Sequence, residues 1–247
     1  MKPPKASFVI PAFNAEAFLA QALISCRVQS VKDIEIIVVD DGSTDGTEEL
    51  VMWHKKQDER IKYCRFSHNK GRSAARNYGN SLADSPIILV LDADDMACKN
   101  RVRDTLLCFQ MKNPDVVYGP FQIMDENDNV IATQKAGKID KKMALETKKN
   151  FIGHSTMAYR KNVTLNVQYD EGIFSKLGLD DWKFQWDCVL KGYKFEVLSP
   201  YLSRYRIYSL PNQTYGSPTE FFRDDKEVQR VKDEFIAGIS DRFAQKV

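Results

Sequence analysis

The 247-residue sequence has no long hydrophobic run. Its longest apolar stretches hold about five residues, whereas a membrane-spanning helix needs roughly 20. Near the N-terminus the apolar segment 8–10 ends at Pro11 and is too short for the core of a signal peptide. We therefore expect no transmembrane segment and a cytoplasmic protein.

Paired cysteines and a strong excess of charge are also missing. The five cysteines are scattered and none belongs to a C-x-x-C pair, so we expect neither a zinc site nor a disulfide framework. Buried free thiols in a reducing compartment are the prediction. The formal net charge of +2 is too small to indicate nucleic-acid binding from composition alone.

Missing motifs disfavour several enzyme classes. A dinucleotide-dependent oxidoreductase needs G-x-G-x-x-G after its first strand, and the chain has none. A sugar-1-phosphate nucleotidyltransferase would carry a glycine-rich loop with arginine and lysine there, but the sequence is PAFNAEAF. A haloacid-type phosphatase has its D-x-D motif near the N-terminus, whereas D-x-D begins here at Asp92.

Strand-like and helical patterns alternate along the first half. The alternation predicts βαβ units and a mostly parallel sheet, that is, an α/β fold. The β-branched run from Ile34 predicts a strand buried on both faces. The expected strands are 7–10, 34–42, 61–66, 86–91 and 116–124. The first expected helix follows Asn14, which would cap it, and the others begin near Thr47, at 73 and near Asn100.

The second half is less regular. Segment 180–190 has helical spacing, with Trp182 and Trp186 facing inward. We further expect an exposed helix over 141–149, strands over 153–159 and within 196–208, and a charged helical tail from Pro218. No repeat or low-complexity linker divides the chain, so we predict a single domain with a nucleotide-binding N-terminal half.

Polar segments follow three of the predicted strands. They are 11–14, 40–43 and 92–95. Ligands of open α/β sheets bind beyond the carboxyl ends of the strands, so these segments should meet at one edge. Their convergence predicts a ligand site more strongly than any one of them does.

In the segment LVLDADD, an apolar strand is followed directly by Asp92, Asp94 and Asp95. Carboxylates this close repel one another and raise each other's pKa unless a positive charge lies among them. One interpretation is a solvated loop or a helix N-terminus. The other, which the preceding strand favours, is a site for Mn²⁺ or Mg²⁺, which bind one or two carboxylates together with substrate phosphates.

Two further segments suggest donor and catalytic chemistry. In NKGRSAARN (69–77), Gly71 permits close approach of a ligand, and Arg76 at a helix start suits a diphosphate. The alternative is a surface helix with solvated arginines. Asp180-Asp181 at the start of a predicted helix is either a simple cap or an oriented carboxylate able to take a proton.

Together these segments resemble family 2 glycosyltransferases of the GT-A fold. The resemblance spans roughly residues 7–208 and rests on VIPAFN, IIVVDDGSTDGT, NKGRSAARN, LVLDADD and GLDDWKFQWDCVLKG. It implies a Rossmann-like sheet flanked by helices and inverting transfer of a sugar from a nucleotide donor, with UDP expected. It also implies a nucleotide-sugar half over about 1–97, an acceptor and catalytic half over about 98–208, and a C-terminal helical extension over 209–247.

The resemblance also implies roles for individual residues. Asp181 is similar to the catalytic base, and Asp94 and Asp95 to the metal ligands. Asp180, Trp182 and His154 would face the acceptor. The donor contacts it implies are Pro11, Ala12, Phe13 and Asp41 at the nucleobase, Gly71 and Arg76 beside the diphosphate, Asp92 near the ribose or sugar, and Ala93 and Asp94.

Departures from the family pattern leave alternatives open. Asp180 stands where glutamate is usual, and Tyr208 stands where a tyrosine-arginine-x-histidine segment would carry its histidine. A catalytically inactive nucleotide- or glycan-binding module is the alternative to an enzyme. The expected acceptor is a glycan or a lipid-linked saccharide, and a modified nucleic-acid base is less favoured, although aromatic and basic residues in 204–215 could stack on either.

Overall fold

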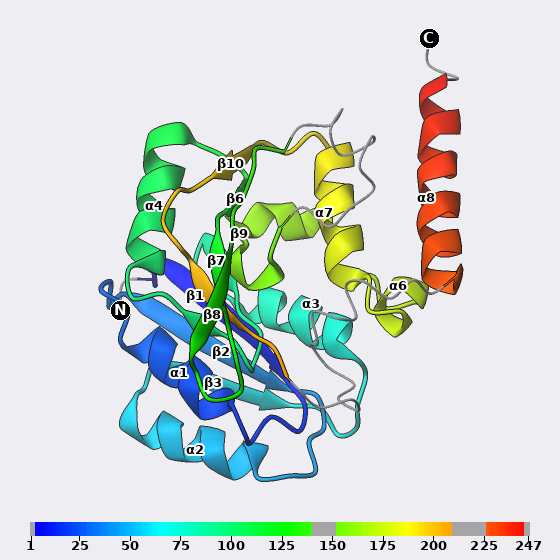
Figure 1. Ribbon diagram of the computed structural model, residues 1–247. Coiled ribbons are helices and arrows are strands. Elements are labelled where there is room, and N and C mark those ends of the chain that lie inside the picture. The colour runs from blue at the N-terminus through cyan, green and yellow to red at the C-terminus, as the bar shows by residue number, and fades with distance from the viewer. Residues whose placement is uncertain (1–2, 140–151, 209–225, 245–247) are drawn as a thin grey trace.

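The computed structural model describes residues 3–139, 152–208 and 226–244, with side chains of the last segment to residue 237. In this part of the chain a central sheet of seven strands has the order β10-β6-β9-β4-β1-β2-β3 (Figure 1). All its neighbours are parallel except β9, which is antiparallel to β4 and β6. The strands are β1 (Ala6–Ala12), β2 (Ile34–Asp40), β3 (Ile61–Arg65), β4 (Ile87–Val90), β6 (Val116–Tyr118), β9 (Ala158–Arg160) and β10 (Phe195–Val197).

The centre of this sheet is buried on both faces. Every residue of β1 and β2 is buried, which confirms the prediction from the β-branched run. Side chains of successive residues alternate between the faces, so Phe8 and Ile10 belong to one core cluster and Val9 to the other. The first cluster includes residues of α1 (Leu19–Arg27), α2 (Thr47–Gln57) and α4 (Arg101–Lys112), and the second includes residues of α3 (Arg72–Leu82) and α7 (Asp180–Leu190).

A second sheet of four strands lies in the described residues beside the first and has the order β5-β11-β7-β8. Its strands are β5 (Met96–Ala97), β7 (Phe121–Met124), β8 (Val130–Gln134) and β11 (Ser203–Arg206). The single strand predicted over 116–124 was wrong, because the chain leaves the first sheet at Gly119-Pro120 and enters the second at Phe121. Proline has no amide hydrogen to donate to a continuous strand ladder.

Two more local predictions were wrong. The expected strand over 153–159 is a short 3-10 helix, η1 (His154–Thr156), followed by β9. Asn14 does not cap α1, which begins only at Leu19. Instead, Asn14 adopts a left-handed conformation (φ 48°), and its side-chain oxygen accepts a hydrogen bond from the Thr44 amide at 2.8 Å. Asn14 thereby joins the chain segments that leave β1 and β2.

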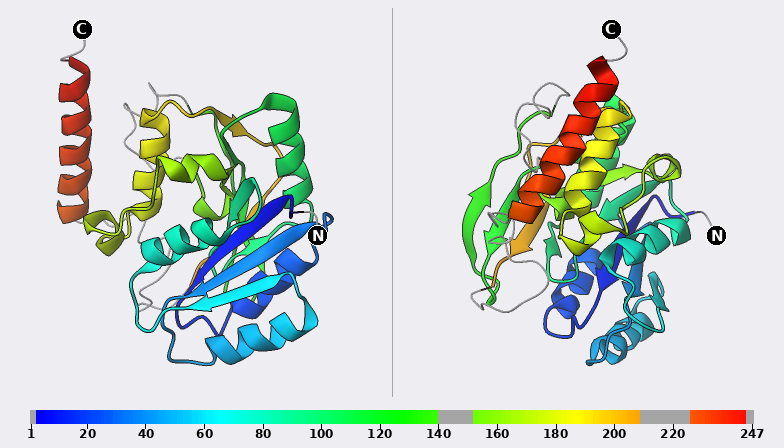
Figure 2. Two further views of the ribbon diagram at one scale, coloured as in Figure 1. Left: turned by 180° about the vertical axis from the view of Figure 1, so that it is seen from behind. Right: turned by 90° about the vertical axis from the view of Figure 1, so that its right-hand side faces the viewer.

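The C-terminal helix α8 (Lys226–Ala244) lies beside α7, as the right-hand view of Figure 2 shows. A third core cluster joins α6 (Ile173–Lys176), α7 and α8. The helix predicted over 141–149 and the start of the predicted tail lie outside the described residues. No helix in the described segments is both long enough and apolar enough to cross a bilayer, and the cytoplasmic location stays a prediction. The five cysteines are free thiols, and three of them are buried.

Gly79 provides a test of how α3 packs on the sheet. A Cβ at this position would lie 2.5 Å from Val9 Cγ1 and 3.3 Å from Val39 Cγ2, so an added methyl group overpacks the contact between α3, β1 and β2. We expect Gly79→Ala to lower the free energy of unfolding by about 1–3 kcal/mol. Thermal unfolding would show this as a lower Tm. Gly137→Ala is the matched control, because nothing lies within 4 Å of its Cβ position; an equal loss in both variants would contradict this packing.

Candidate active site

The predicted polar segments do meet at one edge of the central sheet. β4, β1 and β2 are neighbours, and the chain runs outward from β1 on one side before it returns to β4 on the other. This reversal of strand order is where open α/β sheets bind ligands. Gly42 (φ 77°) allows a close approach there, because a Cβ would lie 2.7 Å from the backbone carbon of His68.

Asp41 lies in the loop after β2 and contacts the loop before α3 at this edge. Its two carboxylate oxygens accept hydrogen bonds from the backbone amides of Lys70, at 2.6 Å, and Gly71, at 2.8 Å. Burial raises the pKa of Asp41 despite these bonds. The contact fixes the loop that leads into α3, and the positive φ of Gly71 (93°) is one that glycine adopts without strain.

Two arginines of α3 connect three parts of the site. Arg76 donates through Nη2 to Asp92 Oδ1 at 2.6 Å and through Nη1 to Asp180 Oδ2. Arg72, one helical turn earlier, donates through Nε to Asp180 Oδ1 at 2.8 Å. The spacing of four residues puts both guanidinium groups on one face of α3. Asp180 is fully buried, so these ion pairs satisfy a carboxylate that would otherwise be costly to bury.

The acidic segment after β4 is electrostatically strained. Burial alone would raise the pKa of Asp92, but the Arg76 guanidinium holds it at about 2. Burial and the neighbouring Asp92 raise the pKa of Asp94 to about 6. Burial and the Asp94 and Asp92 carboxylates raise the pKa of Asp95 well above its usual range. Asp94 and Asp95 therefore resist ionisation unless a further positive charge approaches.

Arg206, the last residue of strand β11, holds the acidic segment in place. The Arg206 backbone amide donates to Asp95 Oδ1 at 2.8 Å, and its guanidinium donates to the Asp94 carbonyl oxygen at 2.9 Å. The same side chain is fully buried and pairs with Asp128 at the β7–β8 turn. Tyr208 donates its hydroxyl to Asp94 Oδ2 at 2.8 Å. These contacts join residues more than 70 positions apart, and no sequence motif indicates them.

The predicted base, Asp181, lies at the first turn of α7. Its Oδ1 accepts a hydrogen bond from the Trp182 amide at 2.6 Å, and the residue is 9% exposed. Arg76 binds both Asp180, the residue before the predicted base, and Asp92, so the start of α7 and the acidic segment meet at one site. Burial, and then the nearby carboxylates, raise the pKa of the Tyr205 phenol on β11 well above its usual range.

Comparison with known proteins identifies the family of this chain. Residues 7–167 match the model of glycosyl transferase family 2. The chain belongs to this family. An uncharacterised glycosyltransferase of Methanocaldococcus jannaschii is 29% identical over 215 residues, which cover 84% of this chain and 72% of that protein. The GalNAc(5)-diNAcBac-PP-undecaprenol beta-1,3-glucosyltransferase of Campylobacter jejuni is 26% identical over 226 residues, covering 89% of this chain and 70% of that one.

Solved structures agree on the fold. The crystal structure of S. aureus TarS 1–349 in complex with UDP-GlcNAc aligns with a TM-score of 0.68 at 21% identity and covers 92% of this glycosyltransferase and 65% of that chain. A longer TarS structure aligns at a TM-score of 0.67, and this chain covers 39% of it. The α/β architecture predicted from sequence is confirmed, with a mixed rather than wholly parallel sheet.

Three predicted acceptor contacts are buried in this glycosyltransferase. Trp182 is 1% exposed and packs among aromatic rings of α6, α7 and α8. Asp180 is engaged by the two arginines. His154 is 2% exposed, its Nε2 lies 3.3 Å from the Tyr169 hydroxyl, and burial followed by Arg76 lowers its pKa to about 3. Trp182 faces inward, as the helical spacing of 180–190 predicts, and the contact of these three residues with an acceptor stays a prediction.

The remaining predicted donor residues lie at the ends of β1 and β4. Pro11 and Ala12 are buried in β1, where they pair with Val39 and Asp40 of β2. Phe13 and Ala93 are half-buried at the sheet edge. Their roles in binding a nucleobase or a sugar stay predictions.

The acidic segment suits a divalent cation that shares its ligands with a substrate. No group of three or more histidine, cysteine, aspartate or glutamate side chains suited to a metal occurs in the part of the chain that the structure describes. However, Asp95 Oδ2 is buried and, among described residues, has no hydrogen-bond partner. Mg²⁺ and Mn²⁺ commonly take one or two carboxylates and complete their shell with phosphate oxygens and water. Asp94 and Asp95 fit that requirement.

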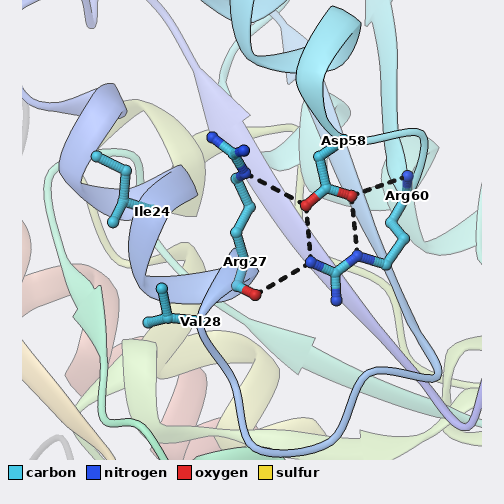
Figure 3. A pocket seen from close by; sticks show the side chains of 5 residues that line it. All are labelled: Ile24, Arg27, Val28, Asp58 and Arg60. Atoms are coloured by element: carbon cyan, nitrogen blue, oxygen red, sulfur yellow. Dashed lines mark hydrogen bonds and ion pairs between the residues drawn. The ribbon is translucent and has the colours of Figure 1, made fainter.

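A surface pocket of about 410 Å³ lies at the other edge of the sheet and is no candidate for the active site (Figure 3). Its charged residues come from the end of α1 and the segment before β3. Arg27 and Arg60 both point at Asp58, with N–O distances of 3.2 and 2.7 Å. Asp58 offsets one of the two positive charges, and its carboxylate engages both guanidinium groups.

The raised pKa of Asp94 makes a prediction for the metal-free glycosyltransferase. A carboxyl group whose pKa is higher in the folded than in the unfolded protein costs stability as the pH rises from about 4 through about 6. With a chelator present at pH 7.5, Asp94→Asn should therefore raise the free energy of unfolding by on the order of 1 kcal/mol. Tm should rise with it. The gain should vanish near pH 4, and thermal scans across this range would measure it.

Asp84→Asn is the control for this experiment. Asp84 is exposed, and the neighbouring Lys62 lowers its pKa, so its substitution should not stabilise the protein at pH 7.5. An Asp94→Asn variant no more stable than the wild type at pH 7.5 would contradict the electrostatic strain.

Proposed function

We propose that this chain transfers a sugar from a nucleotide-diphosphate donor, with UDP as the nucleotide, to an acceptor hydroxyl with inversion at the anomeric carbon. The observation that carries the proposal is the Arg76 guanidinium, which binds both Asp92 after β4 and Asp180 beside Asp181 at the start of α7, at the end of the sheet where α/β folds bind nucleotides. Membership of family 2 and the likeness to TarS in complex with UDP-GlcNAc support it.

The donor side is built from the ends of β1, β2 and β4. Asp41, in the loop after β2, holds the backbone of Lys70 and Gly71 in place. Phe13 would offer an aromatic surface to the nucleobase of the donor. The first turn of α3 presents amide groups and Arg72, and Arg76 follows one turn later, a combination that attracts diphosphate. Asp92, kept ionised by Arg76, would accept hydrogen bonds from ribose or sugar hydroxyls.

The transfer step needs a base and a stabilised leaving group. Asp181 would take the proton of the acceptor hydroxyl as its oxygen bonds to the anomeric carbon, while the bond from that carbon to the diphosphate oxygen breaks. A base of low pKa suffices, because the hydroxyl becomes acidic only as the new bond forms. Asp94 and Asp95 would hold Mn²⁺ or Mg²⁺, which supplies positive charge for the departing diphosphate.

The acceptor would be a glycan or lipid-linked saccharide. The name of the Campylobacter relative, a glucosyltransferase acting on an undecaprenol-linked saccharide, favours this class over a nucleic-acid base. Arg206 on β11 cannot stack on an acceptor, because its guanidinium is fully buried against the acidic segment and lies over the Phe18 ring.

Thermal shift with nucleotides tests the donor site. We expect UDP to raise Tm only in the presence of Mn²⁺ or Mg²⁺, and more than GDP, CDP or dTDP do. Ligand at 100 times its Kd adds about 2.7 kcal/mol to stability, which is several degrees at roughly 2–4 °C per kcal/mol. A larger rise with another nucleotide would overturn the UDP assignment, and no rise with any of the four would overturn the donor site.

Substitution of the base separates an enzyme from a binding module. Release of UDP from UDP-GlcNAc, with water as acceptor, should fall by about 10²–10⁴ in Asp181→Asn, because the general base is lost. The Tm rise with UDP should remain, since Asp181 is not part of the donor side. Asp187→Asn is the control on the same helix: its carboxylate pairs with Lys183, and its activity should be close to wild type. UDP binding without any turnover in the wild type would favour the binding module.

A further inference from the structure

Helix α8 is docked on the catalytic helix through an aromatic contact. The Phe235 ring lies 5.6 Å from Phe174, 5.6 Å from Trp182 and 6.4 Å from Trp186, measured between centroids. Val231 and Ile236 are each 6% exposed and belong to the same cluster. Aromatic pairs of this kind stabilise by about 0.5–1.5 kcal/mol each beyond their burial. The contact fixes the position of α8 beside the first turns of α7 (Figure 2).

This docking brings one lysine to the start of α7. Lys232 Nζ lies 5.4 Å from the centroid of the Trp182 ring, and Trp182 is the residue whose amide binds the Asp181 carboxylate. Burial lowers the pKa of Lys232, and the Asp181 carboxylate opposes this shift. The ammonium group therefore lies over the aromatic ring of the residue next to the proposed base.

Arg230, another basic residue of α8, does not share this position. Arg230 has a side chain 60% exposed and pairs along the helix with Glu227 and Glu234, as a solvent-facing residue does. Lys232 is only partly exposed, and a buried ammonium is costly unless a negative charge or an aromatic face accompanies it. In this structure it has both.

We propose that Lys232 is a positioning residue for Asp181, so that the C-terminal helix completes the acceptor side of the active site. This rests on the proposed function, in which Asp181 takes the acceptor proton. In this role the ammonium attracts the carboxylate, and a positive charge beside a carboxylate favours its ionised form. Two further groups act on Asp181 from neighbouring elements, the Arg72 guanidinium on α3 and the Tyr205 phenol on β11, and Lys232 is the contribution of α8.

The charge contact can be measured without turnover. Reductive ¹³C-methylation keeps lysines charged and gives each an NMR signal whose shift follows its titration, and the Lys232 signal is assigned by its loss in Lys232→Arg. In Asp181→Asn the Lys232 pKa should fall, by on the order of half a unit, because the carboxylate that favours the ammonium is gone. Asp187→Asn, which removes the neighbouring carboxylate of α7, should leave it unchanged. An unmoved Lys232 titration in Asp181→Asn would overturn the proposal.

The kinetic role is tested by UDP release from UDP-GlcNAc. In Lys232→Met the acid limb of the kcat profile should move upward by about half a pH unit, because a positive charge near the base is lost. KM should change less than about twofold, since Lys232 lies away from the donor side. Lys232→Arg should restore the wild-type profile, and Arg230→Met on the exposed face of α8 should not alter it. An unchanged profile in Lys232→Met, with Tm also unchanged, would overturn the proposal.

The two experiments separate this inference from the proposed function. No UDP release by the wild type would overturn the proposed reaction, and with it the positioning role, even if Asp181→Asn still moved the Lys232 signal. Release by the wild type together with an unmoved Lys232 signal would overturn the role of Lys232 alone. A moved signal, a shifted acid limb and rescue by arginine would together support both.

Discussion

Three carboxylates, Asp92, Asp94 and Asp95, are concentrated at the end of β4, and much of the surrounding structure depends on how their repulsion is balanced. Arg76 approaches from α3 and keeps Asp92 ionised. Arg206 and the amide of its own residue approach from β11. Because Arg206 also pairs with Asp128, the second sheet is fixed relative to the first through this acidic segment. What remains unbalanced is the charge on Asp94 and Asp95, which suits a cation that arrives with the substrate.

A second consequence concerns the coupling of the two halves of the site. Asp180 begins the helix that carries the proposed base, and it is bound by two arginines from the helix that begins the donor site. Arg76 also binds Asp92. A diphosphate that attracted Arg72 or Arg76 would compete with Asp180, so occupation of the donor site and the position of α7 are physically linked. Breaking a buried ion pair on one side leaves an unpaired charge on the other.

Tyr208 gives this member of family 2 a distinct detail. Its hydroxyl donates to Asp94 Oδ2 and its ring lies 5.1 Å from that of Phe18. Histidine, which the family pattern would place here, offers a ring nitrogen that can ligate a metal, whereas the phenol donates a hydrogen bond to the Asp94 carboxylate. A cation bound at Asp94 would have to share that oxygen with the Tyr208 hydroxyl or displace it.

The sequence by itself determined the alternation of strands and helices, the buried central strands and the polar segments at their carboxyl ends. These follow from local patterns of side-chain size, polarity and glycine, which act over a few residues. The partition of 116–124 between two sheets, the insertion of β9 in an antiparallel sense and the place of Asn14 did not follow from such patterns. They depend on which strands pair, and that is decided by contacts between distant segments.

The same division applies to the site. Asp41, Arg76, Asp92, Asp94, Asp95 and Asp181 were all named from motifs, because each stands at a strand end or a helix start. Only the tertiary structure decided three other features. Arg72 and Arg76 both bind Asp180, the Trp182 ring packs against Phe174 and Phe235, and Arg206 contacts the acidic segment. The approach of Lys232 to Asp181 is of the same kind: no local pattern relates residues 51 positions apart, and only the packing of Phe235 against α7 brings them together.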